Sequence, residues 1–115
     1  MAREATAASR GRAENHVTRL ASFFAAATPV RIPVRLTRRD AGEGFSENTV
    51  IEFGTPREVL FACAAPLEFA DRIHLQNPDG SLDVEATVVA VQYHEGKTAV
   101  AARFTQDVAN WIVKP

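Results

Sequence analysis

The stretch FSENTVIEFGTPREVLFACAAPL, residues Phe45–Leu67, decides the expected fold of this chain. It holds two segments rich in apolar residues, Phe45–Phe53 and Arg57–Ala64, with Gly and Pro in residues 54–56 between them. β-Branched and aromatic residues favour extended strands, and Gly and Pro between two such segments are typical of a turn. The stretch therefore predicts two consecutive strands joined by a short connection.

The segments on either side of this stretch have the same strand character. In residues 30–37, apolar and polar residues alternate with a period of two, which indicates a half-buried strand. Pro33 lies within this segment and cannot donate a hydrogen bond, so the strand should either lie at an edge or leave one side unpaired there. Three further strand segments follow: Arg72–Gln76, Leu82–Tyr93 and Thr98–Thr105. Short strands at this regular spacing predict a mainly all-β fold, a small antiparallel β-barrel of about six strands.

The segment before the first strand has a helical pattern instead. Its apolar residues recur at the spacing of one helix face, and they are Val17, Leu20, Ala21 and Phe24. Because the residue before a proline avoids the α conformation, Thr28 and Pro29 should end this element. Residues 13–28 are therefore expected to form an amphipathic helix, which packs either on the barrel that follows or on a partner.

The chain thus divides into three parts. Residues 1–12 are small, polar and charged, without an apolar period, and predict a disordered tail. The amphipathic helix occupies residues 13–28, and the barrel domain occupies residues 29–115. Near the end of this domain, residues 107–113 are expected to make one or two helical turns that place Trp111 over an end of the barrel.

Composition argues against several functional classes. The chain has 115 residues, of which 46% are apolar and 23% charged, as expected for one globular domain. Its formal net charge is −1, so it lacks the excess of Lys and Arg that gives nucleic-acid-binding proteins most of their non-specific affinity. No apolar run reaches the roughly 18–20 residues of a membrane span, and the N-terminal segment lacks the apolar core of a signal peptide. We therefore expect a cytoplasmic protein that neither crosses a membrane nor binds nucleic acid.

The residues that commonly carry chemistry are few and scattered. Cys63 is the one cysteine, which excludes an internal disulfide and a Cys-x-x-Cys metal site. The histidines are His16, His74 and His94, and none forms an i, i+4 pair with another. The sequence therefore predicts no metal, no cofactor and no enzyme activity.

The opening stretch nevertheless has the residue order of a known family. Phe45, Glu47 and Thr49 form an F-x-E-x-T pattern that follows a strand with the letters PVRL and a Gly-containing loop. The later segment 72–104 continues the same order of strands. In these features the chain resembles, over residues 30–115, the PilZ domains, which are bacterial receptors for cyclic di-GMP. The resemblance implies a small β-barrel that takes part in second-messenger signalling.

The PilZ resemblance also implies a ligand motif in two parts, an RxxxR element and a D/N-x-S-x-x-G element. Arginines suit cyclic di-GMP because a guanidinium binds phosphate through two hydrogen bonds and also stacks on guanine. In the second element, Phe53 replaces the polar residue, Thr55 keeps a hydroxyl group, and Glu58 replaces the glycine. A carboxylate about 4 Å from a phosphate repels it by about 1 kcal/mol in water, and by about 4 kcal/mol at an effective dielectric constant of about 20. We therefore expect the hairpin part of the ligand site to be disabled.

The first element has two interpretations. Arg31 and Arg35 match RxxxR as letters, but they lie inside an expected strand, whereas the family's pair precedes that strand. The preceding residues 23–27 contain no arginine. In one interpretation Arg31 and Arg35 are outward-facing strand residues. In the other, Arg38 and Arg39 extend the same basic face to a modest anion-binding patch, which Arg57 joins across the hairpin.

The residues and the resemblance together predict a non-enzymatic, PilZ-like regulatory or adaptor domain of bacterial second-messenger signalling. It is expected to act by binding another protein, with little or no affinity for cyclic di-GMP. The alternative is a true cyclic di-GMP receptor, whose ligand-binding residues would be Arg31, Arg35, Thr55 and Arg57. The remaining alternative is an oligonucleotide-binding barrel, which would need exposed aromatic side chains on which bases stack.

Overall fold

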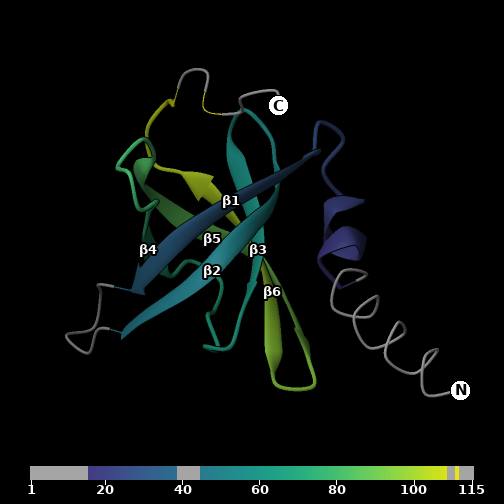
Figure 1. Ribbon diagram of the computed structural model, residues 1–115. Helices are drawn as coiled ribbons and strands as arrows, with labels where there is room; N and C mark the ends of the chain where they lie inside the picture. Colours follow the sequence, from purple (N-terminus) through teal and green to yellow (C-terminus); the bar gives the residue numbers. More distant parts are fainter. Residues whose placement is uncertain (1–15, 39–44, 109–110, 112–115) are drawn as a thin grey trace, which may run out of the picture.

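A computed structural model describes residues 16–38, 45–108 and 111 of the chain. Six antiparallel strands form a closed barrel in the order β1-β2-β3-β6-β5-β4 (Figure 1). The strands are β1 (Thr28–Arg38), β2 (Phe45–Gly54), β3 (Glu58–Cys63), β4 (Arg72–Gln76), β5 (Asp83–His94) and β6 (Lys97–Phe104). The prediction of a small, mainly β barrel of six strands is confirmed.

Strand β1 is paired along its two sides to different lengths. Its register with β2 runs from Thr28 to Arg38, whereas its register with β4 covers only Arg35 to Arg38. Pro33 lies opposite Val50 of β2, beyond the last pair that β1 makes with β4. Because proline has no N–H group, a further ladder bond could not form at this residue. One side of β1 is therefore unpaired at Pro33, as predicted.

Strands β3 and β6 are buried on both faces. Their inward side chains, among them Phe61 and Val100, belong to the core that fills the barrel. Their outward side chains, among them Leu60, Ala99 and Ala101, belong to a second apolar cluster. Strands covered on both faces have no polar side to alternate with the apolar one. This is why the sequence is almost continuously apolar in both strands.

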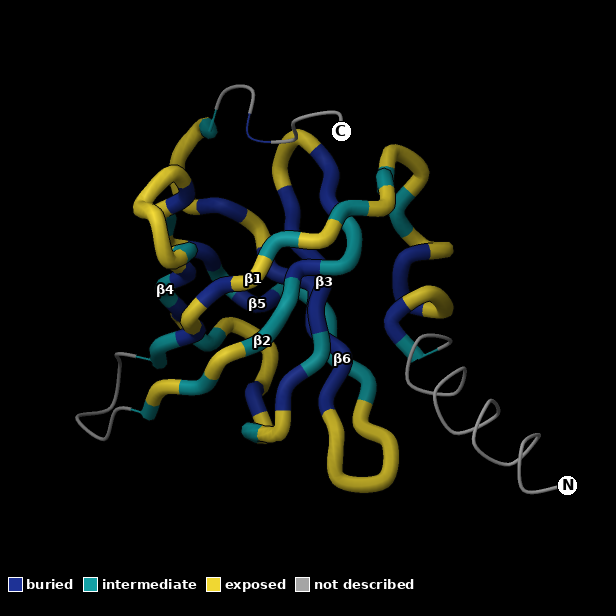
Figure 2. Tube along the Cα trace, in the orientation of Figure 1, coloured by how far each residue is buried: buried dark blue, intermediate teal, exposed yellow. Residues whose placement is uncertain are grey.

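The N-terminal helix covers this outer cluster. Val17, Leu20 and Ala21 are buried and pack against the outward side chains of β3 and β6. Figure 2 shows that the helix has a buried side and an exposed side. The helix therefore packs on its own barrel, which is the first of the two arrangements that its apolar stripe allowed.

The helix ends earlier than expected. The described helical residues are 16–21, so the expected range of 13–28 extends too far at its C-terminal end. After residue 21, the N–H of Phe24 donates to the carbonyl of Ala21 (2.9 Å), and the N–H of Ala27 donates to the carbonyl of Phe24 (3.0 Å). Each of these hydrogen bonds joins residues three positions apart and closes a turn. Through these turns the chain passes from the outer face of the barrel to the start of β1 at Thr28. Pairing of β1 with β2 therefore overrides the helical preference of the alanines.

Two other expected segments fall wholly or largely outside the described residues. The tail at residues 1–12 lies entirely outside them. In the segment 107–113, where helical turns were expected, Asp107, Val108 and Trp111 are described, and none of the three is helical.

Side chains continue the connection between β2 and β3 where the backbone register ends. The paired residues of β2 are Ile51, Phe53 and Gly54. Further along β2, Thr49 Oγ1 donates to the carbonyl oxygen of residue 62 (2.5 Å), and the Glu47 carboxylate accepts a hydrogen bond from the N–H of residue 64 (2.7 Å). Two residues of the F-x-E-x-T pattern thus satisfy backbone groups that the ladder leaves open.

Candidate functional site at the β2–β3 hairpin

The hairpin that joins β2 to β3 is closed by the hydroxyl group of Thr55. The backbone N–H of Thr55 donates to the carbonyl of Glu58 (2.9 Å). Its side-chain Oγ1 accepts hydrogen bonds from the backbone N–H groups of Arg57 (3.0 Å) and Glu58 (2.8 Å). Pro56 follows Thr55, at the turn position where the fixed φ of proline is favourable. The sequence Thr-Pro-Arg-Glu thus forms a tight turn, and its hydroxyl group is used within that turn.

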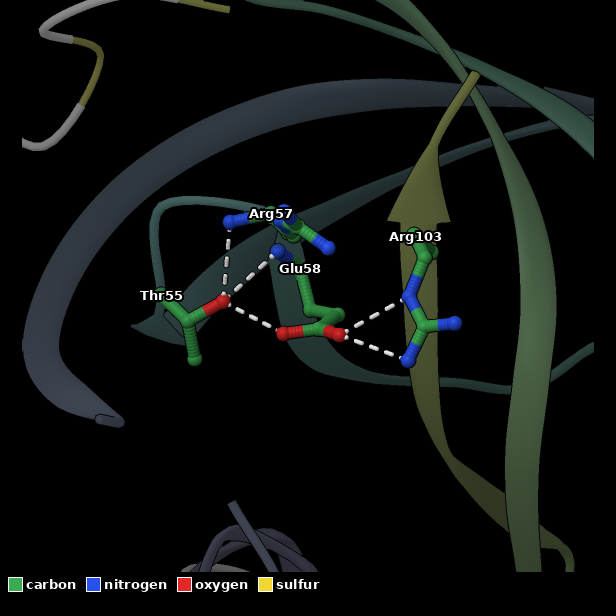
Figure 3. A network of polar contacts seen from close by, with 4 residues as sticks. All are labelled: Thr55, Arg57, Glu58 and Arg103. Carbon is green, nitrogen blue, oxygen red and sulfur yellow. Dashed lines mark hydrogen bonds and ion pairs between the residues drawn. The ribbon is translucent and has the colours of Figure 1, made fainter. Parts of the chain in front are cut away.

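The carboxylate of Glu58 is also satisfied within the molecule. Its Oε1 accepts a hydrogen bond from Thr55 Oγ1 (2.5 Å), and its Oε2 accepts one from Nε of Arg103 (2.9 Å) and forms an ion pair with Nη2 of the same residue (2.9 Å) (Figure 3). The register of β3 with β6 places Glu58 directly opposite Arg103. Glu58 is buried, and the charge of Arg103 offsets the cost of burying its carboxylate. Thr55 and Glu58, the residues that align with the serine and the glycine of the PilZ ligand motif, are therefore hydrogen-bonded to each other at this hairpin.

Trp111 covers the same hairpin. Its indole N–H donates to the carbonyl oxygen of Thr55 (2.9 Å), and its ring meets Phe104 edge to face, with centroids 5.2 Å apart. The ring lies so close to Gly54 that a Cβ atom on this residue would be 2.4 Å from Trp111 Cη2. Gly54 is therefore required for a close approach, and Trp111 lies against the barrel end as its position in the sequence suggested.

A cleft of about 360 Å³ separates the hairpin from the segment that leads into β1. Residues 23–26 line one side of the cleft, and Thr55–Glu58 line the other. Residues 23–26 belong to the stretch that should carry the arginines of a PilZ ligand motif, but they are Phe and Ala. Phe23 is 72% exposed beside this cleft. The cleft therefore has an apolar wall where the resemblance would place cations.

The four predicted ligand-binding residues are distributed over different surfaces. Thr55 and Arg57 line the hairpin cleft, and Arg57 is exposed there. Arg35 lines a separate groove on β1, β2 and the loop after β4. Arg31 is exposed on β1, within the irregularity of its pairing with β2. Only two of the four residues thus line a common cleft.

Sequence reasoning missed Arg103, the partner of Glu58. Arg103 is separated from Glu58 by 45 positions, and no local pattern connects the two residues. Its position in an apolar strand was the available signal, because a charged residue there faces outward beside a neighbouring strand. The identity of that neighbour follows only from the register of β3 with β6.

Other reactive groups are few in the described part of the chain. Burial, followed by the charge of Glu47, raises the pKa of the Cys63 thiol to about 12. Because the thiolate is the nucleophilic form, this thiol is unreactive near neutral pH. Among residues 16–38, 45–108 and 111, no three His, Cys, Asp or Glu side chains are grouped so that they could hold a metal ion. In the same residues no helix is long and apolar enough to cross a membrane.

Comparison with known proteins supports the fold. No protein-family model matches the chain, and no curated protein matches it. Among solved structures, the fold is similar to that of the inhibitor of motility MotI/DgrA from Bacillus subtilis, with a TM-score of 0.52 and 14% sequence identity. The similarity covers 73% of this chain and 43% of that chain. At this identity the likeness concerns the fold: the chain has a six-stranded barrel similar to part of MotI/DgrA.

Proposed function

We propose that this chain is a PilZ-like regulatory or adaptor domain that acts by binding another protein, without enzymatic activity and with little or no affinity for cyclic di-GMP. The observation that carries the proposal is the closed network of Thr55, Glu58 and Arg103. A ligand phosphate at this hairpin would have to displace bonds that the side chains already make with one another.

The geometry of Glu58 supports this reading further. Its carboxylate points into the hairpin, and Arg103 neutralises it from the neighbouring strand. Recruiting Arg103 to a phosphate would leave a buried carboxylate without its cation, which is costly. Of the two arginines at this hairpin, Arg103 is therefore already engaged within the protein.

The apolar wall of the hairpin cleft supports a protein ligand in place of a nucleotide. Phe23 projects from residues 23–26, and Arg57 lies across the cleft from them. Exposed aromatic residues beside an arginine are the residue types enriched at the energetic centres of protein interfaces. The structural neighbour is described as an inhibitor of motility, a regulatory role that agrees with this class.

Calorimetric titration of the full chain with cyclic di-GMP tests the absence of nucleotide binding. We expect no saturable heat, because the hairpin groups are satisfied internally. Stoichiometric binding in the micromolar range that is lost in Arg31→Ala or Arg35→Ala would contradict the proposal and establish the cyclic di-GMP receptor.

A pull-down from cells that express the domain tests the positive half of the proposal. The bait is the full chain, and Phe23→Ala is the matched variant, since an exposed side chain can be truncated without disturbing the core. We expect a defined partner that wild type retains and Phe23→Ala loses. Persistent recovery of no partner would count against an adaptor. A gel shift with oligonucleotides at low salt would instead identify an oligonucleotide-binding barrel.

A further inference from the structure

A second cavity lies on the outer surface of the barrel, in a different place from the hairpin cleft. It is a groove of about 560 Å³. Its lining residues are Pro33, Val34, Arg35, Asn48, Thr49, Gln76, Asn77 and Pro78. The groove borders the point where β1 stops pairing with β4, because the register of these strands ends at Arg35 and Pro33 lies beyond it. The loop after β4, with Asn77 and Pro78, forms the opposite wall.

Three polar side chains stand in a row across this groove. Arg35 lies directly opposite Asn48 of β2 on one side and Gln76 of β4 on the other. Residues that are directly opposite in neighbouring strands project from the same face of the sheet, with Cβ atoms about 4.5–5.5 Å apart. All three residues are exposed. The guanidinium group is thus flanked by two neutral amides.

These three side chains differ from the other polar residues of the groove. Thr49 and Asn77 make structural hydrogen bonds, Thr49 to the carbonyl of residue 62 and Asn77 to Ser81. Within the described residues, no hydrogen bond or ion pair engages the side chains of Arg35, Asn48 or Gln76. Among the described residues, no Asp or Glu lines the groove. The positive charge of Arg35 is therefore not neutralised by the described residues around it.

We propose that this groove binds a small organic anion, whose carboxylate or phosphate group pairs with Arg35. A guanidinium forms two parallel hydrogen bonds with either oxyanion. The amides of Asn48 and Gln76 each offer donors and an acceptor, so they suit hydroxyl or amide groups next to the oxyanion. Apolar atoms of the ligand would contact Pro33 and Pro78. The volume of the groove lies within the roughly 300–1,000 Å³ typical of small-molecule sites.

This proposal is independent of the proposed function. The hairpin cleft and the groove share no lining residue, so a protein partner at Phe23 and an anion at Arg35 can bind separately. Loss of partner binding in Phe23→Ala would leave the groove unaffected. Failure of the anion to bind would likewise leave the adaptor role unaffected.

Nuclear magnetic resonance titration of the full chain tests the groove. The probes are inorganic phosphate and succinate, each added at constant ionic strength against sodium chloride. We expect saturable shifts of the backbone amide signals of Arg35, Asn48 and Gln76 with at least one probe. The probe that saturates at the lower concentration identifies phosphate or carboxylate as the preferred group. Shifts that stay linear with both probes would overturn the proposal.

Matched variants separate a built site from general attraction to positive charge. In Arg35→Gln the affinity should fall about tenfold or more, as expected when a charge-assisted hydrogen bond is lost. Arg31→Gln removes the same charge from the same strand, four residues away and outside the groove. It should change the affinity by less than about twofold, because at physiological ionic strength exposed charges more than about 8 Å apart are largely screened. Equal weakening in both variants would show nonspecific attraction and refute the site.

A third variant tests the arrangement without removing the arginine. Asn48→Asp places a carboxylate directly opposite Arg35, where it would pair with the guanidinium and compete with the anion. We expect this variant to lose saturable binding. Wild-type affinity in Asn48→Asp would contradict the proposal. Because all the substituted side chains are exposed, the dispersion of the amide signals should confirm that each variant is folded.

Discussion

Two polar clusters on the same barrel use similar residue types in opposite ways. At the hairpin, Arg103 lies opposite Glu58, and the hydroxyl group of Thr55 and both carboxylate oxygens of Glu58 are engaged within one network. In the groove, Arg35 lies between the amides of Asn48 and Gln76 and has no carboxylate partner among the described lining residues. The difference is the cross-strand neighbour of each arginine. The residue directly opposite each arginine therefore decides whether that arginine forms a structural ion pair or is available to a ligand. The local sequence motif does not decide it.

The two clusters should also differ in what they contribute to folding. A satisfied, partly buried network stabilises the native state, because breaking it leaves a polar group without its partner. An exposed side chain without a partner contributes little. Substitutions that break the hairpin should therefore lower the free energy of unfolding, and equivalent substitutions in the groove should not.

The largest expected effect is the removal of the aromatic cover of the hairpin. Trp111 is buried, and its ring contacts Gly54 and Phe104 while its N–H binds Thr55. Trp111→Ala should lower the free energy of unfolding by about 3–5 kcal/mol, since it opens a cavity and leaves a carbonyl unpaired. Urea denaturation measures this value, and Phe23→Ala is the exposed aromatic control, expected within about 0.5 kcal/mol of wild type. A loss in Trp111→Ala as small as the control would show that the ring does not cover the hairpin.

The next effect concerns the hydroxyl group inside the hairpin. Thr55→Val keeps the shape of the side chain but removes one donor and the acceptor for two backbone N–H groups. We expect a loss of about 1–3 kcal/mol in the free energy of unfolding. Thr87→Val is the matched control, because Thr87 lies on the other side of Arg103, in β5. A double-mutant cycle with Glu58→Gln should give a coupling free energy of about 0.5–3 kcal/mol, and additivity would show that the network is not a unit.

The contrast between these clusters explains how far sequence reasoning reached. Strand positions were predicted closely, because alternation, β-branched residues and turn residues are local signals. Strands β3 and β6 were also predicted as strands, whereas their burial on both faces, with a helix on the outer face, appears only in the structure. The helix end at residue 21 was missed, since turn bonds that lead into β1 replaced the expected helical turns.

The candidate site was harder to predict than the fold, for a physical reason. Comparison of Phe53 and Glu58 with the PilZ motif predicted a disabled ligand site, and that prediction needed only the motif itself. The network that the structure has at this hairpin depends on a non-local pair, Glu58 with Arg103. The groove around Arg35 depended on two registers at once, those of β1 with β2 and with β4. Cross-strand neighbours are set by tertiary pairing, so no pattern within one strand reveals them.

The next prediction concerns a contact between the N-terminal helix and strand β5 of the barrel. The ring of His16 meets the ring of His94, with centroids 5.2 Å apart. Burial, followed by the charge of His94, lowers the pKa of His16 below 6.5, and a hydrogen bond to the Gln92 carbonyl opposes this shift. Since the unfolded chain then binds more protons than the native protein, stability should fall as the pH is lowered through 6.5 and the native pKa below it.

The test is a series of urea denaturation curves between pH 7.5 and about 5, over the range where histidine titrates. We expect the free energy of unfolding of wild type to decrease across this range, with a smaller decrease in His16→Gln, which keeps a hydrogen-bond donor but does not titrate. Identical pH profiles of the two proteins would show that this contact does not couple helix docking to protonation.

The most direct test of the comparison makes the same substitution at both arginines, and the smallest expected effect is the one at Arg35. Arg103→Gln leaves Oε2 of the buried Glu58 without its cation and should lower the free energy of unfolding by about 1–3 kcal/mol. Arg35→Gln removes an exposed guanidinium with no partner in the described chain, so the same measurement should stay within about 0.5 kcal/mol of wild type. A comparable loss at both positions would mean that Arg35 is engaged in folding, and it would remove the physical basis for a free guanidinium in the groove. An unchanged stability in Arg35→Gln, together with weakened anion binding, would instead separate folding from recognition at a single side chain.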